Sequence, residues 1–154
     1  MIELQCHLYL EGPPQVDFDE ITEFLGVMPT KTRRARPRSA ELVAILGEPG
    51  DGWTYKTAMV GPTERSDNSQ QAWHYPTIMT GMAPVLAVVS GREDEIRRFC
   101  EERGLSLDVI LVIRSEDWSL PILELSADVV MSLARLGAGF EVAPYLDVGP
   151  LDDD

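Results

Sequence analysis

Five basic side chains lie close together in the first quarter of the sequence: Lys31, Arg33, Arg34, Arg36 and Arg38. Guanidinium groups form paired hydrogen bonds with carboxylates and phosphates, so this cluster has the chemistry of an anion-binding site. No acidic residue occurs between Glu23 and Glu41, although the whole 154-residue chain has a formal net charge of −13. We call residues 31–38 the basic segment.

Three interpretations of the basic segment remain open. The sequence favours a solvated loop whose cations pair with the protein's own carboxylates, because isolated runs of charge are usually solvated. The second interpretation is a site for a small anion or for an acidic partner. The third, a nucleic-acid site, is disfavoured. Outside the segment the formal charge is −18, that is −13 less five positive charges, and this background repels phosphate backbones over a Debye length of about 8 Å.

Aromatic residues are the second set of candidates: Trp53, Trp73, Tyr75 and Trp118. Exposed Trp and Tyr side chains are frequent anchors at protein interfaces. Trp53 is expected on a strand, which favours burial, whereas the other three are open between packing and binding. His74 lies between Trp73 and Tyr75 and is the best-placed titratable group, but no acid that would pair with it is identifiable. The sequence therefore assigns no catalytic residue.

Metal and cofactor motifs are absent from the sequence. The two cysteines and two histidines, Cys6, Cys100, His7 and His74, lack the spacing that places two ligands on one zinc ion. Glycine-rich phosphate loops and the nucleophile elbow are also absent. We therefore expect no metal and no cofactor, and we expect both cysteines to be reduced core residues.

Hydrophobic periodicity, capping residues and glycines predict an alternating series of strands and helices. The expected strands are residues 2–11, 52–60, 105–114, 120–125 and 139–148. The expected helices are residues 17–26, 72–89, 90–104 and 126–137, with one or two further turns at 40–47. Gly81 and Pro84 oppose a continuous helix at 72–89, where a helix is nevertheless favoured.

Local signals also predict how some of these elements begin and where they lie. Asp17 and Glu20 have the spacing of a capping box, as do Ser90 and Glu93. Pro144 cannot donate a hydrogen bond to a neighbouring strand, so the last strand is expected at an edge of the sheet.

The element order predicts a single α+β domain over residues 1–148, followed by an acidic tail at 149–154. Strands 105–114 and 120–125 are too closely connected for a parallel crossover. We therefore expect a mixed or antiparallel sheet of four or five strands, with helices mainly on one face, of the ferredoxin-like type. No signal peptide or membrane-spanning segment is evident in the sequence, which favours a cytoplasmic protein that does not enter the membrane.

Several motifs follow the pattern of one family. The chain contains the run FDEITEFLGVMPTKTRRARPR, an isolated Gly52-Trp53 pair, the run LDVILVIRSEDWSLPILELSADVVMSLARLGAGFEV and a late aromatic residue at Tyr145. With these motifs the chain resembles, over nearly its whole length, the bacterial family called domain of unknown function 4279. The residues that match are Ile21, Thr22, Leu25, Gly26, Pro29, Trp53, 123–126, Leu133, Leu136 and Gly137. Ala143 and Pro144 depart from the pattern, which has an acidic and an aliphatic residue there.

The resemblance implies a small cytosolic bacterial protein without an established reaction, and some members of the family look like immunity proteins of toxin systems. The acidity of the chain favours a basic protein partner such as a toxin, because complementary potentials promote association. A non-enzymatic interaction protein is therefore the leading hypothesis. The alternative is a small-anion or small-ligand domain, or an enzyme, in which the basic segment, His74 and Trp53 line one cleft.

Overall fold

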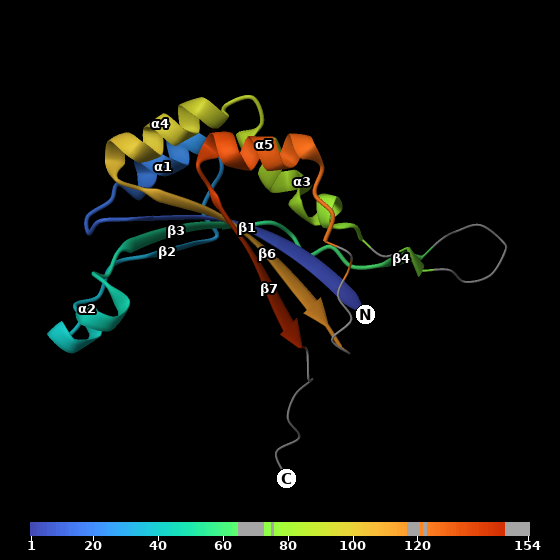
Figure 1. Ribbon diagram of the computed structural model, residues 1–154, viewed down its shortest axis with the longest axis horizontal. Coiled ribbons are helices and arrows are strands. Elements are labelled where there is room, and N and C mark those ends of the chain that lie inside the picture. The colour runs from blue at the N-terminus through green and yellow to red at the C-terminus, as the bar shows by residue number, and fades with distance from the viewer. Residues whose placement is uncertain (65–72, 75, 117–120, 122, 147–154) are drawn as a thin grey trace, which may run out of the picture.

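The structure, a computed structural model, describes residues 1–64, 73, 74, 76–116, 121 and 123–146, and it describes only the backbone of residues 64, 73, 74 and 146. Tyr75 and Trp118, two of the predicted aromatic anchors, lie outside the described residues. In the described part, five helices and a five-stranded mixed sheet form an α+β fold (Figure 1). The predicted α+β class, with a mixed sheet, is confirmed.

The sheet is organised around its long central strand, β1. Its strands are β1 (Ile2–Gly12), β2 (Lys31–Arg33), β3 (Asp51–Lys56), β6 (Ser106–Ser115) and β7 (Gly139–Leu146), in the spatial order β2-β3-β1-β6-β7. Strand β1 pairs antiparallel with β3 and β6, β2 pairs antiparallel with β3, and β6 and β7 are parallel. The short strands β4 (Thr63–Glu64) and β5 (Trp73–His74) form a separate antiparallel pair. Strand β7, with Pro144, is at an edge as predicted.

The connection from β6 to β7 differs from the sequence prediction. The predicted strand at 120–125 is wrong for the residues that the structure describes, since residues 121 and 123–125 belong to no strand. A short apolar run is ambiguous, and the proline in this one removes a backbone donor. The chain instead passes through α5 (Ala127–Leu136) and returns as β7 beside β6. A ferredoxin-like type is not confirmed, because such folds contain split βαβ units whereas β6 and β7 are adjacent.

Helices cover one face of the sheet. They are α1 (Phe18–Leu25), α3 (Ile78–Val89), α4 (Glu93–Arg103) and α5 (Figure 1). The remaining helix, α2 (Ala40–Leu46), lies apart from these beside β2 and β3, and none of its residues is buried. Among the described residues, no helix combines the length and the apolar character needed to cross a membrane.

The core lies between the helices and the sheet. In β1 the predicted alternation is confirmed, because Leu4, Cys6, Leu8 and Leu10 are buried and the residues between them are partly exposed. Trp53, from β3, is fully buried, and its indole Nε1 donates a hydrogen bond of 3.1 Å to the hydroxyl of Thr22 in α1. The core thus joins the first helix to the sheet.

Helix α3 begins later than predicted, at Ile78, and contains both residues that oppose a helix. Residues 73 and 74, which we expected in this helix, belong to β5. Gly81 lies where α3 approaches β1, since a Cβ atom added to it would be 2.9 Å from Cβ of Leu4. The glycine that weakens the helix therefore allows close packing against the central strand.

The predicted capping boxes are only partly confirmed. Asp17 caps α1 and accepts from the backbone N–H groups of Asp19 and Glu20 at 3.0 and 3.1 Å. The Glu20 side chain, however, pairs with Arg103 and not with the N-cap. The second box is wrong, because Ser90 is the C-cap of α3 and Arg92 precedes α4 without a side-chain cap. Ser90 N–H instead donates to the carbonyl oxygen of Leu86 at 2.8 Å, which ends α3.

Both cysteines are buried free thiols, as predicted. Burial raises the pKa of Cys6 to about 12 and that of Cys100 to about 11. Because the thiolate is the reactive form, we expect neither thiol to react readily with an aromatic disulfide reagent in the folded protein. Both should react after unfolding in denaturant, which is the control. Fast reaction of either thiol without denaturant would contradict the packing described here.

Candidate functional site

The candidate residues that the structure describes lie on different elements of the fold. Lys31 and Arg33 are in the edge strand β2, and the rest of the basic segment leads from it toward α2. Trp53 is fully buried, so it presents no surface to a partner. Trp73 and His74 pair through their backbones with β4. Trp53 is not among the residues that line the pocket beside the basic segment.

Asp51, at the start of β3, organises the loops beside the basic segment. Its side chain is only 2% exposed. One carboxylate oxygen accepts from the backbone N–H groups of Gln15 and Val16 at 2.9 and 3.1 Å, and the other accepts from Ala35 N–H at 2.6 Å. Arg34 Nη1 donates to the first oxygen at 2.6 Å. These donors replace the water that a buried carboxylate has lost.

The hydrogen bonds determine the protonation state of Asp51. Burial alone would raise its pKa, but the bonds from Ala35, Arg34 and Val16 outweigh burial and hold the pKa below its ordinary value. Asp51 is therefore ionised at neutral pH. Its contribution to stability is fully present above the ordinary aspartate pKa of about 3.9 and is lost as the pH falls through the lower pKa of the folded state.

Two cations of the basic segment are held by the protein itself. The Arg34 guanidinium, besides pairing with Asp51, lies 3.9 Å from the ring centroid of Phe18. Arg33 donates to the Tyr9 hydroxyl at 3.1 Å and to the Glu11 carboxylate at 3.5 Å, and Tyr9 also donates to Glu11. For these two residues the structure shows the pairing with the protein's own acids that the sequence favoured.

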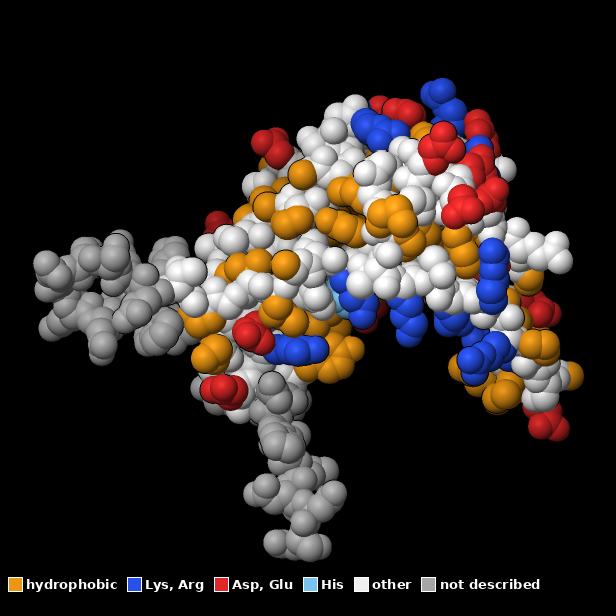
Figure 2. All heavy atoms as spheres, turned by 180° about the vertical axis from the view of Figure 1, so that it is seen from behind, with side chains coloured by type: hydrophobic (Ala, Val, Ile, Leu, Met, Phe, Trp, Pro, Cys, Tyr) orange, Lys and Arg blue, Asp and Glu red, His pale blue; other side chains and the backbone are white. Residues whose placement is uncertain are grey.

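The other three cations, Lys31, Arg36 and Arg38, pair with no carboxylate among the described residues. Arg38 Nη1 donates to the carbonyl oxygens of Leu46 and Gly47 at 3.3 and 2.9 Å, at the end of α2. All three line a pocket of about 690 Å³ that is formed by residues 31–38 and Pro49, and no acidic side chain that the structure describes lines it. Figure 2 shows Lys and Arg side chains gathered beside a hollow of the surface. We call the pocket that residues 31–38 and Pro49 form the basic pocket.

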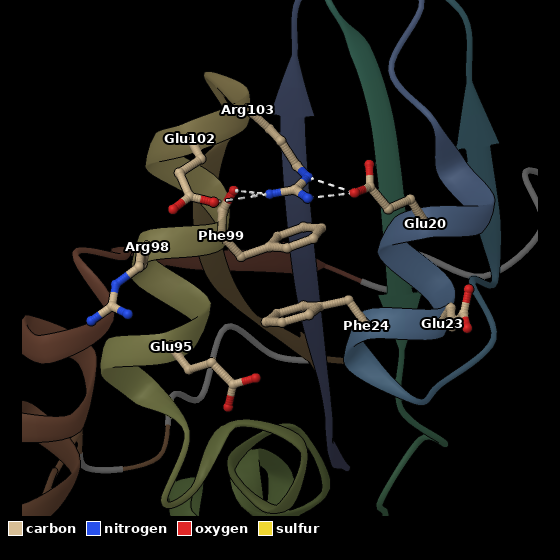
Figure 3. A pocket seen from close by; sticks show the side chains of 8 residues that line it. All are labelled: Glu20, Glu23, Phe24, Glu95, Arg98, Phe99, Glu102 and Arg103. Atoms are coloured by element: carbon tan, nitrogen blue, oxygen red, sulfur yellow. Dashed lines mark hydrogen bonds and ion pairs between the residues drawn. The ribbon is translucent and has the colours of Figure 1, made fainter.

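A second pocket, of about 430 Å³, lies between α1 and α4 (Figure 3). It is lined by Glu20, Glu23, Phe24, Glu95, Arg98, Phe99, Glu102 and Arg103. The lining contains four carboxylates and two guanidinium groups, so its formal charge is negative. We call it the acidic groove.

Two stacked phenyl rings hold the acidic groove together. Phe24 and Phe99 are parallel within 5°, with their centroids 3.9 Å apart. Arg103 lies 3.9 Å from the centroid of Phe99, and Arg92 lies 4.9 Å from that of Phe24, so each ring has a cation on the face turned away from the stack. Figure 3 shows Arg103 above Phe99 and reaching toward Glu20. The stack and this ion pair join α1 to α4.

Charges at the rim of the acidic groove are partly paired. Arg103 forms an ion pair with Glu20 and lowers the pKa of that carboxyl, and Arg92 pairs with Glu95 at 3.3 Å. Glu23 is exposed and has no ion pair among the described residues. The groove therefore retains at least one carboxylate that an external cation can reach without displacing an internal partner.

Local sequence patterns indicated neither the buried ion pair of Asp51 nor the acidic groove. Asp51 stands between Gly50 and Gly52, and these glycines allow β3 to approach the end of β1. A Cβ atom on Gly50 would lie 2.6 Å from the carbonyl oxygen of Gly12, and one on Gly52 would lie 3.1 Å from the Tyr9 ring. The sequence signal that could have indicated a buried Asp51 is its position between two glycines at the start of a strand. The groove had none, because α1 and α4 are far apart in sequence.

The fold and the two pockets define an α+β protein with an open mixed sheet, in which the described residues contain no cluster of metal-ligating side chains. Residues 2–147 match the family described as Domain of unknown function (DUF4279), and the chain belongs to this family. The match covers nearly the whole chain and confirms the resemblance found in its motifs. Comparison with curated proteins and with solved structures gives no significant match.

Replacing the buried carboxylate tests its structural role. We expect Asp51→Asn to lower the free energy of unfolding by about 3 kcal/mol, because it removes a buried ion pair and places an amide against backbone donors. Urea unfolding at neutral pH measures the change. The matched control Asp19→Asn, at an exposed position, should change stability by about 0.5 kcal/mol or less.

Acidification provides a second readout on the same variant. Because the pKa of Asp51 is lowered in the folded protein, the stability difference between wild type and Asp51→Asn should shrink as the pH falls below the ordinary aspartate pKa of about 3.9. A difference that stays constant down to the acid unfolding range would show that ionisation of Asp51 does not contribute.

Proposed function

We propose that the protein is a non-enzymatic interaction protein that binds a basic protein partner through the acidic groove. The excess of carboxylates around this groove, four against two guanidinium groups, is the observation that supports the proposal. The formal net charge of −13 adds a field over the whole molecule that attracts a cationic partner from a distance.

The groove would accept Lys or Arg side chains of the partner at its rim. The faces of Phe24 and Phe99 that point away from their stack are covered by Arg92 and Arg103, so an incoming cation would contact the carboxylates and not a ring face. Glu23, which points away from the phenyl stack in Figure 3, is the most accessible of these carboxylates, because it is exposed and has no internal ion pair in the described part of the chain. The stack of Phe24 on Phe99 orders the groove before a partner binds, which lowers the entropic cost of binding.

A cationic toxin is the class of partner that we favour, and the role would be that of an immunity protein. Such a protein neutralises a toxin by covering a basic functional surface with a complementary acidic one. Exposed charge pairs contribute little binding energy individually, about 0.2–1 kcal/mol each, but they raise the association rate and make it sensitive to salt. Binding that weakens steeply with ionic strength is therefore the expected signature.

Deca-lysine serves as the probe for the groove. We expect it to bind the full chain at low salt and to bind the double variant Glu23→Gln/Glu102→Gln about fivefold more weakly, since two exposed ion pairs are lost. Fluorescence anisotropy of labelled peptide measures the affinities at low and at physiological salt.

The control for this measurement is Glu41→Gln/Glu48→Gln, which removes two exposed carboxylates on and just after α2. This variant should bind deca-lysine within about twofold of wild type. Equal weakening in both double variants would show that only net charge matters, and the groove would lose its assignment. Absence of binding at low salt would reject the proposed function.

A further inference from the structure

We infer that the basic pocket is a second binding site, for a small polyanion that carries two or more phosphate or carboxylate groups. It is distinct from the acidic groove and takes a ligand of the opposite charge, so it goes beyond the proposed function. The pocket volume of about 690 Å³ lies within the range of roughly 300–1,000 Å³ that is usual for small-molecule sites.

The cations of the basic segment divide into two that form internal ion pairs and three that can bind a ligand. Arg33 and Arg34 are neutralised by Glu11 and Asp51, respectively. Lys31, Arg36 and Arg38 line the same pocket and have no carboxylate partner among the described residues. An anion in the pocket would therefore meet three cations whose charge no internal acid compensates.

Internal hydrogen bonds orient the Arg38 guanidinium but use only one of its nitrogens. Its two hydrogen bonds to the carbonyl oxygens at the end of α2 both come from Nη1. The N–H groups on Nε and Nη2 have no partner in the described part of the chain and are those that form a two-point contact with phosphate or carboxylate. The helix end thus fixes a guanidinium that can still bind a ligand.

The backbone of the pocket is fixed at two points before any ligand arrives. Strand β2 pairs with β3, with Lys31 opposite Thr54 and Arg33 opposite Gly52. Two residues beyond Arg33, the N–H of Ala35 donates to buried Asp51 at 2.6 Å. A site whose backbone is already ordered loses less conformational entropy when a ligand binds.

The charge of the protein and the residues that line the basic pocket indicate the size of the ligand. Three cations exceed what one carboxylate can neutralise, which favours a ligand with several anionic groups. The rest of the chain, with a formal charge of −18 after the five cations of the segment are subtracted from −13, repels a long polyanion. Among the described residues no aromatic side chain lines the pocket, so the described lining offers a nucleic-acid base no ring on which to stack.

Calorimetric titration with inorganic pyrophosphate, and separately with citrate, tests the site on the full chain at low salt. We expect saturable binding of one molecule of at least one of these probes, with the stronger probe showing whether phosphate or carboxylate is preferred. The double variant Lys31→Gln/Arg36→Gln should bind that probe about tenfold more weakly or not at all, because two charge-assisted contacts are removed.

A matched control removes two cations outside the pocket, in Lys56→Gln/Arg114→Gln, and should change the affinity by about twofold or less. Three results would overturn the inference: no binding of either probe, equal weakening in both double variants, or tighter binding of a single-stranded oligonucleotide than of pyrophosphate at physiological salt. The groove variant Glu23→Gln/Glu102→Gln should retain probe binding, so each proposal can fail without the other.

Discussion

One buried carboxylate, that of Asp51, fixes the end of the molecule where its unusual charges lie. A charged group with 2% exposure is stable only when donors surround it, and three backbone N–H groups and one guanidinium do so here. Those donors belong to the loop that enters α1 and to the basic segment after β2. A single ion therefore positions both, and it makes Arg34 part of the scaffold, whereas Lys31, Arg36 and Arg38 pair with no carboxylate among the described residues.

Helix α1 connects the two pockets of opposite charge. Its entry is held by the bond from Val16 N–H to Asp51, and its end is held where Arg92 donates to the carbonyl oxygen of Phe24 at 2.9 Å. Between these points, Thr22 accepts from the buried Trp53 and Glu20 pairs with Arg103. The helix is thus fixed at both ends and in the middle. The helix contributes Glu20, Glu23 and Phe24 to the acidic groove and, through Phe18, contacts Arg34 of the basic pocket.

Local patterns in the sequence predicted the parts of the fold that depend on neighbouring residues. The alternation in β1, the Asp17 cap and the α+β class all follow from spacing along a few residues. One local signal failed, since Ser90 ends α3 and does not cap α4, and the other errors lie where distant contacts decide the outcome. Gln15 and Asp51 are 36 residues apart, and Glu20 and Arg103 are 83 residues apart, so spacing could reveal neither the buried ion nor the groove. The predicted strand at 120–125 is wrong for residues 121 and 123–125, and β6 acquires its parallel neighbour β7 through α5.

The two outer strands of the sheet differ in how they resist the addition of another strand. Strand β2 has only three residues, two of them basic, so two copies that met along this strand would bring like charges together. Strand β7 contains Pro144, which offers no N–H group to an incoming chain. Unprotected edges are the usual starting points of edge-to-edge aggregation. Lys31, which has no carboxylate partner among the described residues, therefore also opposes the pairing of two folded chains along β2.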